Sequence, residues 1–282
     1  MDKSGKYLFD RASDRVSRAF TRTYSTSFSL AIRCLHKDLH RPIHAIYGYV
    51  RLADEVVDSL HDFPKKELLA RLRADTKEAI HAGISLNPVL NSFQWAVNTY
   101  KIDQELIDEF LGSMEMDLER TTFDRERFDK YILGSAEVVG LMCLRVFCNG
   151  DDAEYQRLKG PAMRLGSAFQ KVNFLRDLRA DHFDLGRTYF PDVDVSNFSE
   201  AMKKQLEADM RIDFEEGLKG IAMLPRKAQF GVYLAYVYYW TLFKKITATP
   251  ATELVSRRIR ISNPLKMALL ARSAVRYRLD LM

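Results

Sequence analysis

Two stretches of the chain combine an apolar helical pattern with a row of polar side chains. The spacings i, i+4, i+7, i+11 in the first and i, i+3, i+7, i+11 in the second place each row on one helical face. The first row consists of Tyr47, Arg51, Asp54 and Asp58. The second row consists of Gln170, Asn173, Asp177 and Asp181, with Arg176 beside it. Each row ends in an Asp-x-x-x-Asp pair, whose like charges repel unless a cation lies between them.

Side chains of these types suit the binding of a diphosphate together with divalent cations. Mg²⁺ prefers carboxylate oxygen and usually bridges to substrate phosphates, and arginine binds phosphate groups with two hydrogen bonds. A single Asp-x-x-x-Asp pair is usually a solvated helix face. Here both pairs lie in apolar segments, where an unpaired acid is costly. The sequence therefore favours two facing rows that promote the departure of pyrophosphate from an organic diphosphate.

The remaining pattern predicts helices throughout, and we expect a single all-α domain over residues 1–282. Only 13 Gly and 8 Pro are present, and alternating strand patterns are almost absent. We count roughly ten helices joined by short loops, with one irregular stretch over residues 182–198. Helix starts are predicted at Asn87-Pro88, at Asn263-Pro264, and after Pro42, Pro64, Pro161 and Pro225. Helix ends are predicted at Gly83 and Gly150.

Composition limits the partners and the compartment. The chain has 282 residues, and its 43 Lys and Arg against 38 Asp and Glu give a net charge of +5. This scattered excess does not indicate nucleic-acid binding, although it suits an anionic partner. Cys34, Cys143 and Cys148 are too few for a disulfide framework. Because an apolar leader and a membrane-spanning stretch are both missing, we expect a cytoplasmic protein with at most peripheral membrane contact.

The motifs resemble those of the squalene and phytoene synthases, the head-to-head branch of the all-α isoprenoid synthases, and most of all bacterial phytoene synthases. Residues 45–58 are similar to the family's first aspartate-rich motif, and residues 170–191 are similar to its second. The segment Tyr24-Ser25-Thr26-Ser27-Phe28 is similar to a flap that closes over the diphosphate. Tyr239 and Arg258 are similar to positions that contact diphosphate. The resemblance implies a helical bundle around a central cavity.

The resemblance also implies roles for the motif residues. The ligands of Mg²⁺, or of Mn²⁺ in its place, would be Asp54, Asp58, Asn173, Asp177 and Asp181, and the four aspartates would be catalytic. Diphosphate or the flap would be held by Tyr47, Arg51, Gln170, Arg176, Tyr239 and Arg258, and the flap residues Tyr24, Ser27 and Phe28 would also bind substrate. The implied reaction belongs to carotenoid biosynthesis: two geranylgeranyl diphosphate molecules condense head to head to phytoene through a cyclopropylcarbinyl diphosphate.

Two alternative functions remain open at this point. A squalene or dehydrosqualene synthase would take farnesyl diphosphate, and the formation of squalene would also need NADPH. A non-catalytic assembly protein could use the same fold, but such relatives tend to lose aspartates, and all four are present here. The oligomeric state is not predicted.

A few residues keep two interpretations. Tyr131 is followed by Leu133 where relatives often carry a second tyrosine, so it either packs at the edge of the core with its hydroxyl bonded or acts in catalysis. Glu137 is expected to pair with Arg145, with orientation of a metal ligand as the alternative. The basic cluster of Arg257, Arg258, Arg260 and Lys266 suits either anionic lipid or a solvated face.

Overall fold

A computed structural model describes residues 4–119, 122–191 and 193–280. Within these ranges the chain forms α-helices with no β-strand, apart from an isolated bridge between Thr122 and Thr188. The α-helices are α1 (Ser4–Tyr24), α2 (Thr26–Arg33), α3 (Lys37–Asp58), α4 (Lys65–Ala82), α5 (Pro88–Tyr100), α6 (Gln104–Met116), α7 (Arg125–Ile132), α8 (Val138–Phe147), α9 (Asp152–Arg179), α10 (Glu200–Met223), α11 (Arg226–Thr247), α12 (Ala251–Leu254) and α13 (Asn263–Arg278). The all-α prediction is confirmed, with more helices than expected.

Shorter segments complete the backbone. The turns Leu133–Glu137 and Ala180–Asp184 are π-helical, and Val195–Asn197 is a 3₁₀ turn. Most of the stretch predicted to be irregular is so. None of the helices in the described part of the chain has the length and apolarity needed to cross a bilayer.

Several helix ends lie where the sequence places them. The Asn87 side chain caps α5 by accepting from the amides of Val89 and Leu90, at 3.0 and 3.4 Å. Gly83 ends α4 with a positive φ of 68°, a conformation that glycine adopts without steric cost. Helix α13 differs by one position, because Ser262 rather than Asn263 is its N-cap.

Two prolines expected before helices lie inside them instead. Pro42 is within α3 and Pro161 is within α9, so each helix loses one main-chain hydrogen bond. Packing compensates at Pro161, where α9 and α10 approach closely: a Cβ added at Gly220 would lie 2.4 Å from the Pro161 Cβ. Pro42 is itself buried against the core. Burial thus overrides the helix-breaking tendency at both sites.

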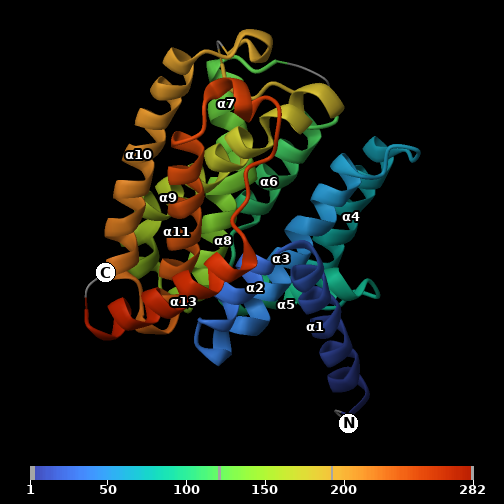
Figure 1. The fold of residues 1–282 in the computed structure, drawn as a ribbon. Helices are drawn as coiled ribbons and strands as arrows, with labels where there is room; N and C mark the ends of the chain where they lie inside the picture. Colours follow the sequence, from blue (N-terminus) through green and yellow to red (C-terminus); the bar gives the residue numbers. More distant parts are fainter. Residues whose placement is uncertain (1–3, 120–121, 192, 281–282) are drawn as a thin grey trace.

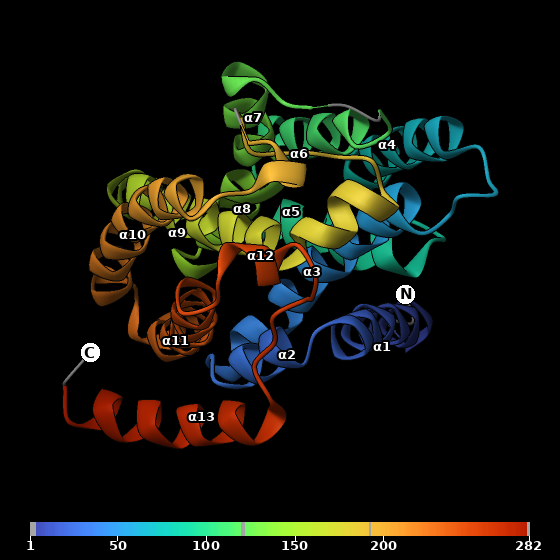
Figure 2. The ribbon, with the colours of Figure 1, turned by 45° about the horizontal axis from the view of Figure 1, so that its top comes forward.

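The helices bury two large hydrophobic clusters. One joins α3, α4, α5, α6 and α8, and includes Tyr49, Phe93 and Phe110. The other joins α9, α10, α11 and the segment that follows α9, and includes Val172, Leu175 and Phe214. Helices α9, α10 and α11 run side by side in Figure 1, and α13 crosses the outer side of α11 and α2 in Figure 2. The two polar rows lie on α3 and α9, so each row belongs to a different cluster.

His44 makes the pH dependence of stability testable. It is buried on α3, and its Nδ1 lies 2.9 Å from the Thr21 hydroxyl. Burial lowers the pKa of His44 to about 4, with Arg18 contributing repulsion. Between about pH 6.5 and pH 4 the unfolded chain therefore binds a proton that the folded chain does not, and stability falls as the pH falls. The loss from this group is about 3 kcal/mol.

We expect the free energy of unfolding of the His44→Asn variant to change less with pH than that of the wild type. Urea unfolding of the wild type and the variant at pH 7 and pH 4.5 measures the difference, and the slope between the two pH values is compared rather than absolute stability. An unchanged slope in the variant would show that His44 is not the group responsible.

Candidate active site

A cavity of about 640 Å³ lies between the two clusters, a size typical of small-molecule sites. Most of its wall is built by α2, α3, α8, α9, α10 and α11. The acidic residues lie toward the C-terminal ends of α3 and α9, whereas the earlier parts of both helices contribute apolar side chains. Along α9 the largely apolar wall from Leu158 to Phe169 extends for about 16 Å. The cavity therefore has a charged end and a long apolar remainder.

The whole first row lies on the cavity wall, as Tyr47, Arg51, Asp54 and Asp58. Arg51 binds Glu55 and lies 3.7 Å from an Asp54 oxygen. Its guanidinium also stacks over the ring of Tyr24, 4.4 Å from the centroid. Tyr24 ends α1 and lines the cavity as well. A cation–π contact thus attaches the segment resembling a flap to the first row.

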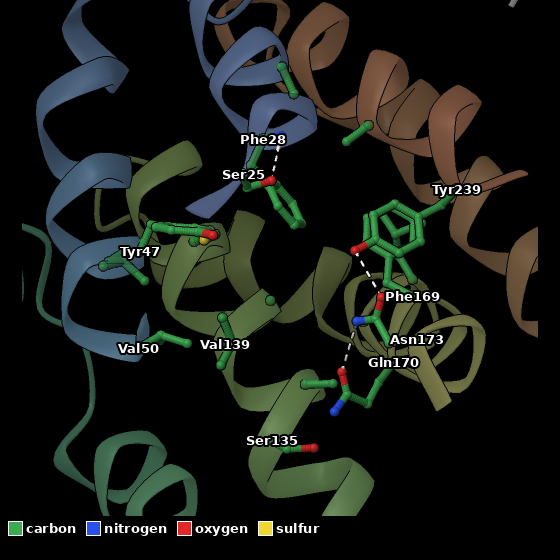
Figure 3. Close-up of a pocket in the computed structure, with 18 of the residues that line it drawn as sticks. Ser25, Phe28, Tyr47, Val50, Ser135, Val139, Phe169, Gln170, Asn173 and Tyr239 are labelled. Carbon is green, nitrogen blue, oxygen red and sulfur yellow. Dashed lines mark hydrogen bonds between the residues drawn. The ribbon is translucent and has the colours of Figure 1, made fainter. Parts of the chain in front are cut away.

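The second row lines the opposite side, as Gln170, Asn173, Asp177 and Asp181. Tyr239 on α11 donates to Asn173 Oδ1 at 3.3 Å, and Asn173 donates to Gln170 Oε1 at 3.2 Å. Figure 3 shows this chain of contacts facing Tyr47 across the cavity. Asp177 is held between two guanidinium groups, with Nε of Arg176 at 3.1 Å and Nε of Arg258 at 2.6 Å. Arg176 and Arg258 also line the cavity.

Arg187 joins the two rows. It follows the second row in the chain, yet its Nη1 donates to Asp58 Oδ1 of the first row at 2.8 Å. Its Nη2 donates to the main-chain carbonyl of Asp117 at 2.6 Å, and the side chain is 6% exposed. The surrounding acids raise the pKa of Arg187 against the effect of burial, so it stays charged. The two rows therefore meet at this end of the cavity.

The acids at this end are crowded. Burial, followed by the charge of Asp58, raises the pKa of Asp54 to about 7. Burial, followed by the charges of Asp177 and Asp58, raises the pKa of Asp181 to about 8. Asp58 lies on α3 and Asp181 lies beyond α9, so acids of both rows contribute negative charge at this end. The site favours the arrival of positive charge.

Asp117 is a buried site residue that sequence reasoning missed. It accepts from the hydroxyls of Tyr131 and Tyr189, at 2.6 and 2.8 Å, and burial raises its pKa to about 6. A signal was present, because Asp117 follows Met114 by three positions and so continues the apolar stripe of α6. The expectation that Tyr131 is buried with its hydroxyl bonded is confirmed, and Tyr131 also lines the cavity.

Only some residues of the segment resembling a flap line the cavity. Phe28 lines the cavity, and so does Ser25, which caps α2 by accepting from the Phe28 amide at 3.1 Å (Figure 3). Ser27 was predicted to bind substrate, but it is not among the lining residues. Successive helical residues are rotated by about 100°, so Ser27 points away from the side shared by Ser25 and Phe28.

The predicted pair of Glu137 and Arg145 is wrong. Arg145 instead bonds Asp103 at 2.8 Å and Asp152 at 2.5 Å. Eight residues make two helical turns plus about 80°, so the two side chains diverge. Burial and the nearby charge of Asp213 raise the pKa of Glu137 to about 7.

Fold and site define a class of protein: a helical bundle whose cavity suits a molecule with an anionic head and a long apolar tail. The sequence profile of the squalene/phytoene synthases matches residues 21–264. The chain belongs to the squalene/phytoene synthase family.

Individual relatives agree with this assignment. The 15-cis-phytoene synthase of Synechocystis sp. is 28% identical over 253 residues, covering 79% of this chain and 73% of that protein. The 4,4'-diapophytoene synthase of Staphylococcus haemolyticus is 26% identical over 175 residues, covering 60% and 59%. The matched region spans only 54–59% of the length of several relatives. A solved dehydrosqualene synthase has the same fold, with a TM-score of 0.80, 18% identity, and coverage of 96% of this chain and 99% of that one.

The central position of Arg187 makes it the test of how the rows are held. We expect Arg187→Met to destabilise the fold by about 3–5 kcal/mol, because it leaves Asp58 and Asp117 without their buried cation. Urea unfolding measures the change. Arg258→Met is the matched control, since Arg258 also pairs with an aspartate of a row but is exposed, and it should cost about 0–1 kcal/mol. Equal losses in the two variants would contradict the role assigned to Arg187.

Proposed function

We propose that the protein condenses two molecules of geranylgeranyl diphosphate head to head into phytoene. The observation that carries this proposal is that both aspartate rows lie on the wall of one cavity whose remaining length is largely apolar. Membership of the family and the similarity to the phytoene synthase of Synechocystis support it.

The first diphosphate ionises to an allylic cation, which the C2=C3 double bond of the second molecule attacks. The resulting cyclopropylcarbinyl diphosphate ionises in turn and rearranges to a product linked C1 to C1′. Two pyrophosphates and two protons leave overall, one proton when the cyclopropane ring closes and one when the last cation collapses to the central double bond.

Arginines at the charged end are placed to bind the diphosphates. Arg51, Arg176 and Arg258 all line the cavity, and each is held by carboxylates of the rows or beside them. A guanidinium matches the geometry of a phosphate and keeps its charge at any physiological pH. Tyr239 and Gln170 fix the orientation of the Asn173 amide between them. These side chains hold the leaving group while the apolar tail extends along α9.

The donor set fits Mg²⁺, with Mn²⁺ as a substitute. Asp54, Asp58, Asn173, Asp177 and Asp181 all offer hard oxygen atoms, and burial, followed by the charges of neighbouring aspartates, raises the pKa of Asp54 and of Asp181. Groups of three or more His, Cys, Asp or Glu side chains close enough to hold a metal are absent from the described ranges. Mg²⁺ is commonly bound by one or two carboxylates together with substrate phosphates. When bound, it would neutralise the charge that develops on the departing pyrophosphate.

The apolar wall would protect the carbocations. Phe169 stacks on Tyr239 with ring centroids 4.0 Å apart, and Phe28 lies 6.0 Å from the same tyrosine ring. All three line the cavity, so aromatic faces are available to positive charge close to the second row. The exclusion of water by this wall prevents premature quenching of a cation.

A second candidate reaction uses farnesyl diphosphate. It is supported by the similarity to the 4,4'-diapophytoene synthase of Staphylococcus haemolyticus. Both reactions use the same charged end, and they differ in the length of apolar wall that the tail occupies.

Incubation of the purified chain with Mg²⁺ and either diphosphate separates the candidates. We expect phytoene from geranylgeranyl diphosphate, and no change in product when NADPH is added. Chromatography and mass spectrometry of the hydrocarbon identify it. Conversion of farnesyl diphosphate alone would replace the first candidate by the second, and a saturated product that appears only with NADPH would indicate squalene formation.

The rows themselves are tested by Asp54→Asn and Asp177→Asn. We expect each variant to lose at least about 100-fold in turnover, because each loses one charged oxygen ligand at the reacting diphosphate. Asp209→Asn is the control, since Asp209 is exposed on α10, away from the cavity. Circular dichroism confirms that the helices persist. Activity close to wild type in either row variant would rule out the catalytic assignment.

A further inference from the structure

The C-terminal part of the chain carries an unusual concentration of positive charge. Residues 254–279 contain no Asp or Glu, and they contain seven basic residues: Arg257, Arg258, Arg260, Lys266, Arg272, Arg276 and Arg278. The whole chain has a net charge of only +5, so this segment alone exceeds the total excess. Arg257 pairs with Glu253 and Arg258 with Asp177, so the charge that remains for another partner lies on Arg260 and along α13.

Helix α13 also presents apolar side chains to solvent. Its inner side packs on α11, with Leu269 and Ser273 buried. Its exposed large apolar residues are Leu265, Met267, Val275 and, just beyond the helix, Leu279, which are 41%, 53%, 58% and 61% exposed. Leu265, Arg272, Val275 and Leu279 follow helical spacing on the outward side. The outward side therefore combines an apolar stripe with arginines.

The helix is attached firmly enough to present this side in one orientation. Tyr238 on α11 donates to the Lys266 carbonyl at 3.0 Å, and the Tyr277 hydroxyl donates to Gln229 at 3.2 Å. Lys266 reaches α2, where its ammonium donates to the Thr26 hydroxyl at 2.6 Å. Figure 2 shows α13 lying across the outer side of α11 and α2 at the edge of the molecule. Both of these helices line the cavity with their other sides.

A shallow hollow extends the basic surface at the start of α13. It is lined by Arg22 from α1, Arg33 from α2 and Lys266 from α13, together with polar residues such as Thr26 and Ser29. Basic side chains of three helices thus converge at the start of α13, on the flank of the helix that carries Lys266 and Met267.

We propose that α13 docks the protein on an anionic lipid bilayer. Its apolar stripe (Leu265, Val275 and Leu279) enters the interface, while Arg272 and Arg278 meet the headgroups. A helix with an apolar side and flanking basic residues lies in the plane of such an interface. Each Lys or Arg near an anionic surface strengthens binding about fivefold. This surface lies outside the charged end of the cavity, so the proposal stands independently of the proposed reaction.

Charge decides against a second copy of the chain as the occupant. In a two-fold dimer through α13, the acid-free segment of one copy would face the same segment of the other. Like charges placed opposite one another across an interface are unfavourable, whereas anionic headgroups complement them.

Flotation with vesicles tests the proposal on the full chain. We expect it to float with vesicles of phosphatidylcholine mixed with phosphatidylglycerol, to do so less as NaCl is raised, and to stay behind with phosphatidylcholine alone. Arg272→Gln combined with Arg278→Gln should weaken binding roughly 25-fold. Leu265→Ser combined with Val275→Ser should weaken it several-fold.

Matched substitutions elsewhere provide the controls. Arg71→Gln removes an exposed charge on α4, and Leu86→Ser removes an apolar side chain that is 90% exposed; both should leave flotation unchanged. Equal binding to neutral vesicles, or equal losses in the controls, would overturn the proposal. So would light scattering that shows a dimer in the wild type and a monomer in the Leu265→Ser, Val275→Ser variant, because the stripe would then join two copies.

Discussion

Like charges at one end of a largely apolar cavity are the constraint on which the rest of this structure depends. Four aspartates of the two rows and Asp117 line the same cavity. Carboxylates this close cannot all be ionised without nearby cations. Arg187 provides the link from Asp58 to the Asp117 main chain, and Arg176 and Arg258 both hold Asp177. The bundle can close around the acids because arginines from distant parts of the chain reach them.

The same constraint explains why the rows come from two different hydrophobic clusters. Each of α3 and α9 is anchored by its own core, with Tyr49 and Phe93 stacked at 3.8 Å behind the first row and Phe174 and Tyr189 stacked at 4.2 Å near the second. Because each wall is anchored by its own core, the opposing carboxylates keep their positions although they repel one another. A diphosphate with its cations would then enter a prepared gap, so little of its binding energy would be spent on ordering the protein.

Much of the fold and most of the rows could be predicted from the sequence. Helical spacing is a local property, so it placed Tyr47, Arg51, Asp54 and Asp58 on one face, and the structure has them on one wall. Caps are also local, and Asn87 behaves as expected. Pro42 and Pro161 were misplaced because tertiary packing, which no local pattern contains, overrides their tendency to break helices.

Long-range contacts account for what the sequence did not reveal. Arg187 meets Asp58 across 129 positions of the chain, and Tyr189 meets Asp117 across 72. Spacing rules give no information at such separations. Asp181 lies in a π-helical turn, whose winding differs from that of α9, so even its register relative to Asp177 was only approximately known. The pairing of Glu137 failed for a simpler reason, since eight residues do not return to the same helical face.

The close contacts between helices at two glycines limit how the width of the cavity can change. Gly220 abuts Pro161, and a Cβ at Gly231 would lie 2.4 Å from the Leu35 side chain. All four of these residues line the cavity, so the packing of the Pro161 and Leu35 side chains directly against glycine main chain sets the spacing of the helices there. A wider cavity would require whole helices to separate, whereas a longer or shorter one needs only different side chains at the apolar end, such as Leu158 or Leu224, which pack together. Members built on this scaffold can therefore alter the length of the molecule they accept far more readily than its thickness.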